Sequence, residues 1–145
     1  MAITQVEPPQ AHEILKKNPD ALYLDVRTED EFAGGHPEGA INVPYMFLIP
    51  GNPQPNPDFV TVLEKNLPKD KKLVVGCLSG GRSQRACEAL EQAGFTNLTN
   101  VRGGFGGARD ASGQIAIKGW RDSDLPVTHD VGENSYQALR SKAGL

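Results

Sequence analysis

The sequence predicts a single α/β domain built on a largely parallel β-sheet. Three observations lead to this prediction. Short apolar runs typical of buried strands alternate along the chain with segments of helical periodicity. The length of 145 residues suits one domain. The 16 glycines and 11 prolines indicate short elements joined by many loops.

The first elements are delimited by proline, glycine and capping residues. A helix is expected from Pro8 to Lys17, with proline in its first turn, and Asn18-Pro19-Asp20 ends it. The run from Ala21 to Asp25 is typical of a buried strand. Thr28-Glu-Asp-Glu31 has the spacing of a capping box, which begins a short helix that ends at Gly34-Gly35.

The next stretch is punctuated by prolines. A short strand from Ile41 to Val43 is closed by Pro44, and four prolines within residues 50–57 require a loop there. The apolar run from Tyr45 to Ile49 is interpreted as buried core, with a pocket lining or a partner contact as the alternatives, since five adjacent apolar residues cannot all face inward on one element. Helical periodicity returns near residues 57–66.

The second half of the chain begins with the clearest strand, Leu73-Val-Val-Gly76. A helix follows from about Arg82 to Ala93, and Gly94 ends it. Residues 97–101 form the last predicted strand. Residues 111–119 have no assignable pattern, and the tail over residues 132–145 is either a terminal helix or frayed.

Composition and motif spacing exclude several classes of protein. The longest apolar run has far fewer than the roughly 20 residues that a membrane-spanning helix needs. The N-terminus lacks the basic and apolar parts of a secretory signal, so the expected location is the cytoplasm. Two cysteines and three scattered histidines provide no metal-ligand spacing, so no metal is expected.

The formal net charge is −3, but basic residues are concentrated in the second half of the chain. Residues 1–66 contain ten acids and four bases, whereas residues 67–145 contain eight acids and eleven bases. No acid occurs between Lys71 and Cys87. Because the chain has neither a long basic stripe nor interleaved aromatic residues, a small anion is a better predicted partner than nucleic acid.

Cys77 stands where the clearest strand passes into a helix, and ligands of open α/β sheets bind beyond the carboxyl ends of the strands. The glycines after it allow a tight loop whose N–H groups and following helix N-terminus surround one concavity. This positive environment should stabilise the thiolate and make Cys77 a nucleophile. The segment that carries these features is Cys77, Leu78, Ser79, Gly80, Gly81, Arg82 and Ser83.

This loop resembles the active-site loop of rhodaneses, the thiosulfate sulfurtransferases. The block from Asp25 to Pro44 resembles the other signature of that family, and Gly103-Gly104, Trp120 and Leu125-Pro126-Val127 resemble its C-terminal end. The resemblance covers about residues 3–128 and departs at the insert over residues 105–119 and in the tail over residues 129–145. It implies a single rhodanese domain over residues 1–145, with helices on both faces of a mostly parallel sheet.

The resemblance also implies a reaction. Cys77 would take a sulfane sulfur from a small anionic donor such as thiosulfate and pass it to a thiol or cyanide, with no cofactor. A persulfide carrier that serves a sulfur-relay protein is a second hypothesis. An arsenate reductase or phosphatase of the related fold is a third, disfavoured because those enzymes have a longer loop between cysteine and arginine.

The charged residues around the loop have alternative interpretations. Arg82 either binds the sulfonate end of the donor or caps the loop by donating to backbone carbonyls. Arg85 either adds positive field at the mouth of the loop or is a solvated helix arginine. Structural roles are expected for Asp25 and Arg27, which pair near the sheet edge, for His36, which hydrogen-bonds within its turn, and for Cys87, which packs in the core.

Overall fold

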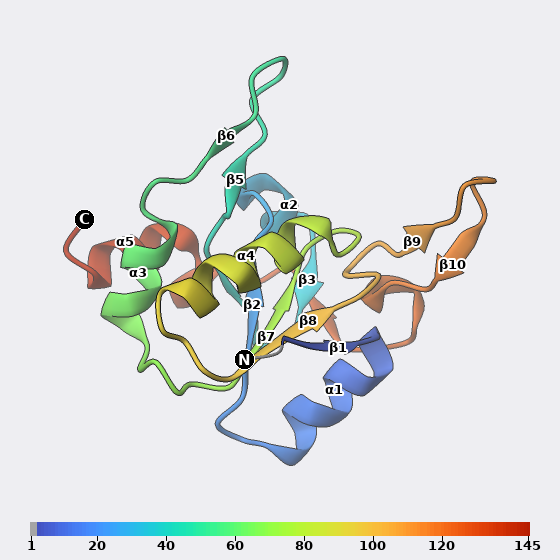
Figure 1. Cartoon of the computed structure of the whole chain (residues 1–145), viewed down its shortest axis with the longest axis horizontal. Helices are drawn as coiled ribbons and strands as arrows, with labels where there is room; N and C mark the ends of the chain where they lie inside the picture. The colour runs from blue at the N-terminus through green and yellow to red at the C-terminus, as the bar shows by residue number, and fades with distance from the viewer. Residues whose placement is uncertain (1–2) are drawn as a thin grey trace.

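The computed structural model describes residues 3–145, and its centre is a five-stranded parallel sheet (Figure 1). Side chains of the central strand β7 point alternately to the two faces of this sheet, so the strand contributes to the core on both sides. Leu73, Val75 and the following Cys77 face one core, whereas Val74 faces the other. In sheet order the strands are β1 (Thr4–Val6), β8 (Leu98–Val101), β7 (Leu73–Gly76), β2 (Leu22–Asp25) and β4 (Ile41–Asn42).

Helices cover both faces of the sheet, as predicted. Side chains of α3 (Phe59–Asn66), α4 (Gly81–Gln92) and α5 (Tyr136–Lys142) belong to the core on one face. Those of α1 (Pro8–Lys17) and α2 (Glu29–Ala33) belong to the core on the other face. The sequence is thus divided between two apolar layers, as in other α/β domains.

The predicted helices and strands agree with the structure to within a few residues. The Thr28 capping box begins α2, and the helix of the tail is α5. Strand β1, which no sequence pattern indicated, completes the sheet by pairing with β8. The tail is held in place because Asn66 of α3 donates to the carbonyl oxygen of Leu139 at 3.1 Å.

Three short antiparallel ladders surround the sheet: β3 (His36–Pro37) with β11 (Val127–Thr128), β5 (Met46–Phe47) with β6 (Gln54–Pro55), and β9 (Ala108–Arg109) with β10 (Ile115–Ile117). Figure 1 shows the β5–β6 and β9–β10 hairpins projecting from the body. Short 3₁₀ turns span Trp120–Asp122 (η1) and Gly132–Asn134 (η2). The unassigned residues 111–119 therefore belong largely to the β9–β10 hairpin.

The expectation that Tyr45–Ile49 is buried core is wrong for its second part. Tyr45 and Phe47 pack against the core, and the Tyr45 ring lies 5.3 Å from that of Phe59 in α3. Leu48 and Ile49 are each 48% exposed, because the chain there enters the projecting β5–β6 hairpin. No helix within residues 3–145 is long and apolar enough to cross a membrane.

Candidate active site

Cys77 directly follows β7, at the carboxyl edge of the sheet where a ligand is expected. Its neighbours on both sides are parallel strands, so the backbone that carries the thiol is rigid. The residue is only 2% exposed, and the N–H of Gly80 donates to its Sγ at 3.1 Å. The sulfur therefore lies inside the loop that follows it and interacts with a backbone donor.

The loop is held from outside by the segment that follows β8. The carbonyl oxygens of residues 77–79 accept hydrogen bonds from N–H groups of Phe105 at 2.8 Å, Gly106 at 2.8 Å and Gly103 at 3.1 Å. Because a peptide N–H points away from its carbonyl oxygen, these bonds orient N–H groups of the loop away from the 103–106 segment. Gly104 leaves room for this contact, since a Cβ there would clash with the carbonyl oxygen of Cys77.

Helix α4 adds positive potential on the open side of the loop. Gly80 adopts φ +116°, a left-handed conformation that favours glycine, and places the first residue of α4 immediately afterwards. The first N–H groups of a helix have no partner within the helix and form its positive end. The N-terminus of α4 and the loop N–H groups can therefore stabilise a negative charge on sulfur.

The exposed part of the loop consists of Leu78, Ser79 and Gly81, while Ser83 is buried. The Ser83 hydroxyl lies 2.6 Å from Oδ1 of Asn100 and 3.1 Å from the carbonyl oxygen of Gly80. Ser83 thus attaches the start of α4 to β8 and supports the loop from beneath.

The guanidinium of Arg82 pairs with Glu31 of α2 and, within residues 3–145, makes no hydrogen bond to a carbonyl oxygen of the loop, so the capping interpretation is wrong, while binding of a donor sulfonate stays a prediction. Nη1 and Nη2 lie 2.8 and 3.1 Å from the two carboxylate oxygens, so the pair is bidentate. Burial opposes ionisation of Glu31, but hydrogen bonds from Arg82 and Thr28 outweigh it and lower the pKa of the carboxyl. The sequence had indicated Glu31 only as a capping residue, and its second role depends on the approach of α2 to the loop.

Arg85 is exposed on α4 and has no ion-pair partner within residues 3–145. Asp25 and Arg27 form a buried ion pair at 2.8 Å. Arg27 also donates to the carbonyl oxygen of Gly35 at 2.7 Å and lies 4.5 Å from the centre of the Phe105 ring. The pair therefore connects the end of β2 with the segment that holds the Cys77 loop.

His36 and Cys87 are buried in separate places. The His36 ring stacks on Phe32 at 3.5 Å, and its Nδ1 lies 2.6 Å from the Phe32 carbonyl oxygen, so its partner is in α2 and not in its own turn. Burial raises the pKa of the Cys87 thiol to about 12. Cys87 therefore stays protonated at neutral pH, as suits a core residue.

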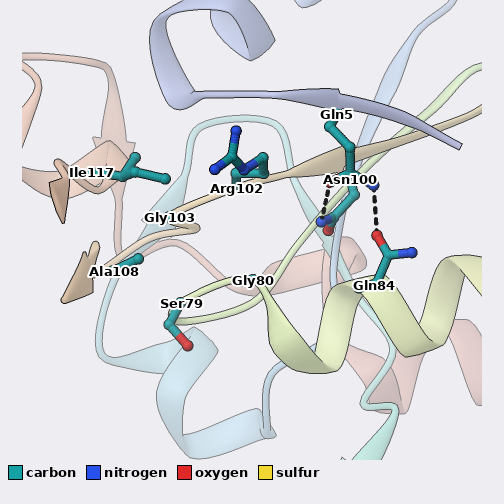
Figure 2. Close-up of a pocket in the computed structure, with 9 residues that line it drawn as sticks. All are labelled: Gln5, Ser79, Gly80, Gln84, Asn100, Arg102, Gly103, Ala108 and Ile117. Carbon is teal, nitrogen blue, oxygen red and sulfur yellow. Dashed lines mark hydrogen bonds between the residues drawn. The ribbon is translucent and has the colours of Figure 1, made fainter. Parts of the chain in front are cut away.

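A cavity of about 550 Å³ lies beside the Cys77 loop (Figure 2). Ser79 and Gly80 belong both to its wall and to the loop, whereas Cys77 does not line it. The sequence did not indicate this cavity, because its lining comes from five separate segments. These residues are Gln5, Ser79, Gly80, Gln84, Asn100, Arg102, Gly103, Ala108 and Ile117.

Comparisons with known proteins point to one family. The family model described as "Rhodanese-like domain" matches residues 7–111. "Thiosulfate sulfurtransferase 18" of Arabidopsis thaliana is 33% identical, over 92% of this chain and 89% of that protein. "Protein HIGH ARSENIC CONTENT 1, mitochondrial" of the same plant is 44% identical, over 61% of this chain and 53% of that protein.

Among solved structures, that of Rv0390 from M. tuberculosis is similar with a TM-score of 0.75 and 32% sequence identity. The similarity covers 90% of this chain and 100% of that one. The chain spans about half the length of several curated relatives that it matches.

Proposed function

The chain belongs to the rhodanese-like family, and we propose that it is a sulfurtransferase in which Cys77 carries the transferred sulfur as a persulfide. Relatives named as sulfurtransferases support the reaction class. The observation that best supports this role of Cys77 is the hydrogen bond from the N–H of Gly80 to Sγ at 3.1 Å. It lies inside a loop whose carbonyl oxygens accept hydrogen bonds from the outer 103–106 segment.

The proposed donor is thiosulfate or a similar sulfane compound. The Cys77 thiolate attacks the outer sulfur of thiosulfate, a sulfur–sulfur bond forms with Sγ, and sulfite leaves with the electron pair of the broken bond. The loop N–H groups and the N-terminus of α4 stabilise the negative charge before and after this step. A thiol or cyanide then removes the outer sulfur and restores the thiolate.

The size of the loop favours sulfur over a tetrahedral oxyanion. Four residues, Leu78 to Gly81, separate Cys77 from Arg82, and Arg82 is already occupied by Glu31. A cation that is neutralised by a carboxylate contributes little to binding phosphate or arsenate. Phosphatase and arsenate reductase activities are therefore the disfavoured alternatives, although one relative is named for arsenic content.

The test is the intact mass of the reduced protein before and after incubation with thiosulfate. We expect a gain of one sulfur atom that cyanide removes. The gain should persist in Cys87→Ser and be absent from Cys77→Ser, with both variants keeping the circular dichroism of the wild type. Sulfur gained by Cys77→Ser, or hydrolysis of an aryl phosphate faster than sulfur transfer, would refute the proposal.

A further inference from the structure

The cavity beside the loop combines groups that recognise a carboxylate and peptide amides. Figure 2 shows the side chains of Gln5, Gln84, Asn100 and Arg102 around it. Ala108 and Ile117 supply a small apolar wall from the β9–β10 hairpin. A site with a few polar groups beside apolar contacts is the usual composition of a small-molecule pocket.

Arg102 is the cation of this cavity. Within residues 3–145, no carboxylate lies within ion-pair distance of its guanidinium, in contrast to Arg82, which Glu31 neutralises. Its backbone is fixed, since its N–H donates to the carbonyl oxygen of Val6 at 2.7 Å. A guanidinium can bind a carboxylate through two parallel hydrogen bonds. Arg102 is thus an arginine in the wall of this cavity that is available to a ligand anion.

The amide side chains hold one another in place. Nδ2 of Asn100 donates to Gln5 at 2.9 Å, and Nε2 of Gln5 donates to Gln84 at 2.6 Å. Oδ1 of Asn100 accepts from Ser83, so the row is anchored at the base of the catalytic loop. An amide NH₂ has two donor hydrogens and its oxygen accepts two bonds, so each group keeps capacity for a ligand. A prearranged row of amides suits the peptide groups of a ligand.

The volume of about 550 Å³ is much larger than thiosulfate needs and lies in the range of pockets for larger small molecules. The cavity also lies close to the sulfur, because Gly80 lines it and its N–H is 3.1 Å from Sγ of Cys77. A ligand of small-peptide size that binds here has its far end at the rim of the loop. The geometry is that of a subsite for the sulfur acceptor.

We propose that this cavity binds the acceptor, an elongated thiol that carries a carboxylate and peptide amides. The carboxylate pairs with Arg102, the amides bind along Gln5, Gln84 and Asn100, and the thiol passes Ser79 to reach the persulfide. This assignment of acceptor rests on the proposed function.

The transfer is balanced without any further reactant. The acceptor thiolate attacks the outer sulfur of the Cys77 persulfide and forms a new sulfur–sulfur bond. The bond to Sγ breaks, and Sγ leaves with the electron pair as the thiolate, which the loop N–H groups stabilise. The products are the acceptor persulfide and free Cys77.

The kinetic test compares an anionic peptide thiol with a small neutral thiol. The sulfur-loaded protein is mixed with glutathione or with 2-mercaptoethanol, and the rate of sulfur release is measured. For Arg102→Gln we expect KM for glutathione to rise about tenfold, from the loss of a charge-assisted contact, with no change for 2-mercaptoethanol. Lys118→Gln is the matched control, since it removes an exposed charge next to Ile117 that does not line the cavity.

An equal rise of KM for both thiols, a rise for neither, or the same rise in Lys118→Gln would overturn the acceptor subsite. A second measurement does not depend on catalysis: S-methylglutathione, which cannot react, is titrated into the unloaded protein by calorimetry. We expect binding that weakens about tenfold in Arg102→Gln. Normal sulfur loading without this binding overturns the subsite alone, whereas Arg102-dependent binding without any sulfur loading overturns the proposed function and, with it, the identification of the bound thiol as a sulfur acceptor.

Discussion

Replacing Glu31 by glutamine removes the negative charge that faces Arg82 while it keeps the shape of the side chain. In the native protein the two side chains are 25% and 16% exposed, and two hydrogen bonds of 2.8 and 3.1 Å join them. Glutamine keeps an oxygen for the capping contacts with Thr28 and for one hydrogen bond to Arg82. The variant therefore isolates the contribution of the charge.

The expected loss of stability is intermediate between two known cases. Exposed ion pairs contribute about 0.2–1 kcal/mol, and hydrogen bonds to charged groups contribute about 1.5–3 kcal/mol. The pair is bidentate and mostly shielded from water, but glutamine retains one of its hydrogen bonds. We expect Glu31→Gln to lower the free energy of unfolding by about 1 kcal/mol at pH 7, or Tm by about 2–4 °C.

The pH dependence identifies the cause of this loss. Because Arg82 lowers the pKa of Glu31 in the folded state, the stabilisation is fully present above the unfolded pKa of about 4.3 and disappears as pH falls through the folded pKa. The difference in unfolding free energy between wild type and variant should therefore shrink below pH 4.3.

Urea unfolding followed by circular dichroism at a series of pH values measures this difference. Glu29→Gln, on the exposed face of the same helix, is the control and should change stability by only a few tenths of a kcal/mol. A difference for Glu31→Gln that stays constant into the acid range would refute the ion-pair explanation, because protonated glutamate is as neutral as glutamine.

Three further predictions follow from the packing around the loop. Gly104→Ala should lower Tm and slow sulfur loading, since a Cβ at this position would clash with the Cys77 loop. The control Gly132→Ala has a similar φ (+47° against +50°) but lies in open space, so it should keep the wild-type loading rate. Equal loading by both variants would contradict the steric argument. Asp25→Asn leaves the buried Arg27 without its carboxylate and should lower the free energy of unfolding by about 3 kcal/mol in urea titrations, and a loss below 1 kcal/mol would argue against a structural tether. Burial raises the pKa of the Cys87 thiol to about 12, so Cys87 should resist iodoacetamide at pH 8 in the folded protein and react with it in urea. Peptide mass mapping measures this labelling, and rapid labelling in the folded state would show that the thiol is accessible.

The sequence by itself was sufficient for the fold class, for helices α1 to α4 and for four of the five strands of the central sheet. The helix over residues 8–17 and the strand over residues 73–76 were predicted with the bounds that the structure has. Such elements follow from hydrophobic period and capping residues, which act over a few positions of the chain. The Cys77 loop could be predicted for the same reason, because the thiol, the glycines and the start of α4 are adjacent in the sequence.

Only the tertiary structure decided which groups the functional side chains meet. Arg82 and Glu31 are 51 residues apart, so no local pattern could show that this carboxylate pairs with the arginine, for which the sequence left open anion binding or capping of the loop. Arg102 and the amide row come together because β1 pairs with β8 across most of the chain length. Local periodicity specifies where an element forms, but the choice of partner depends on how the packed elements bring distant segments together.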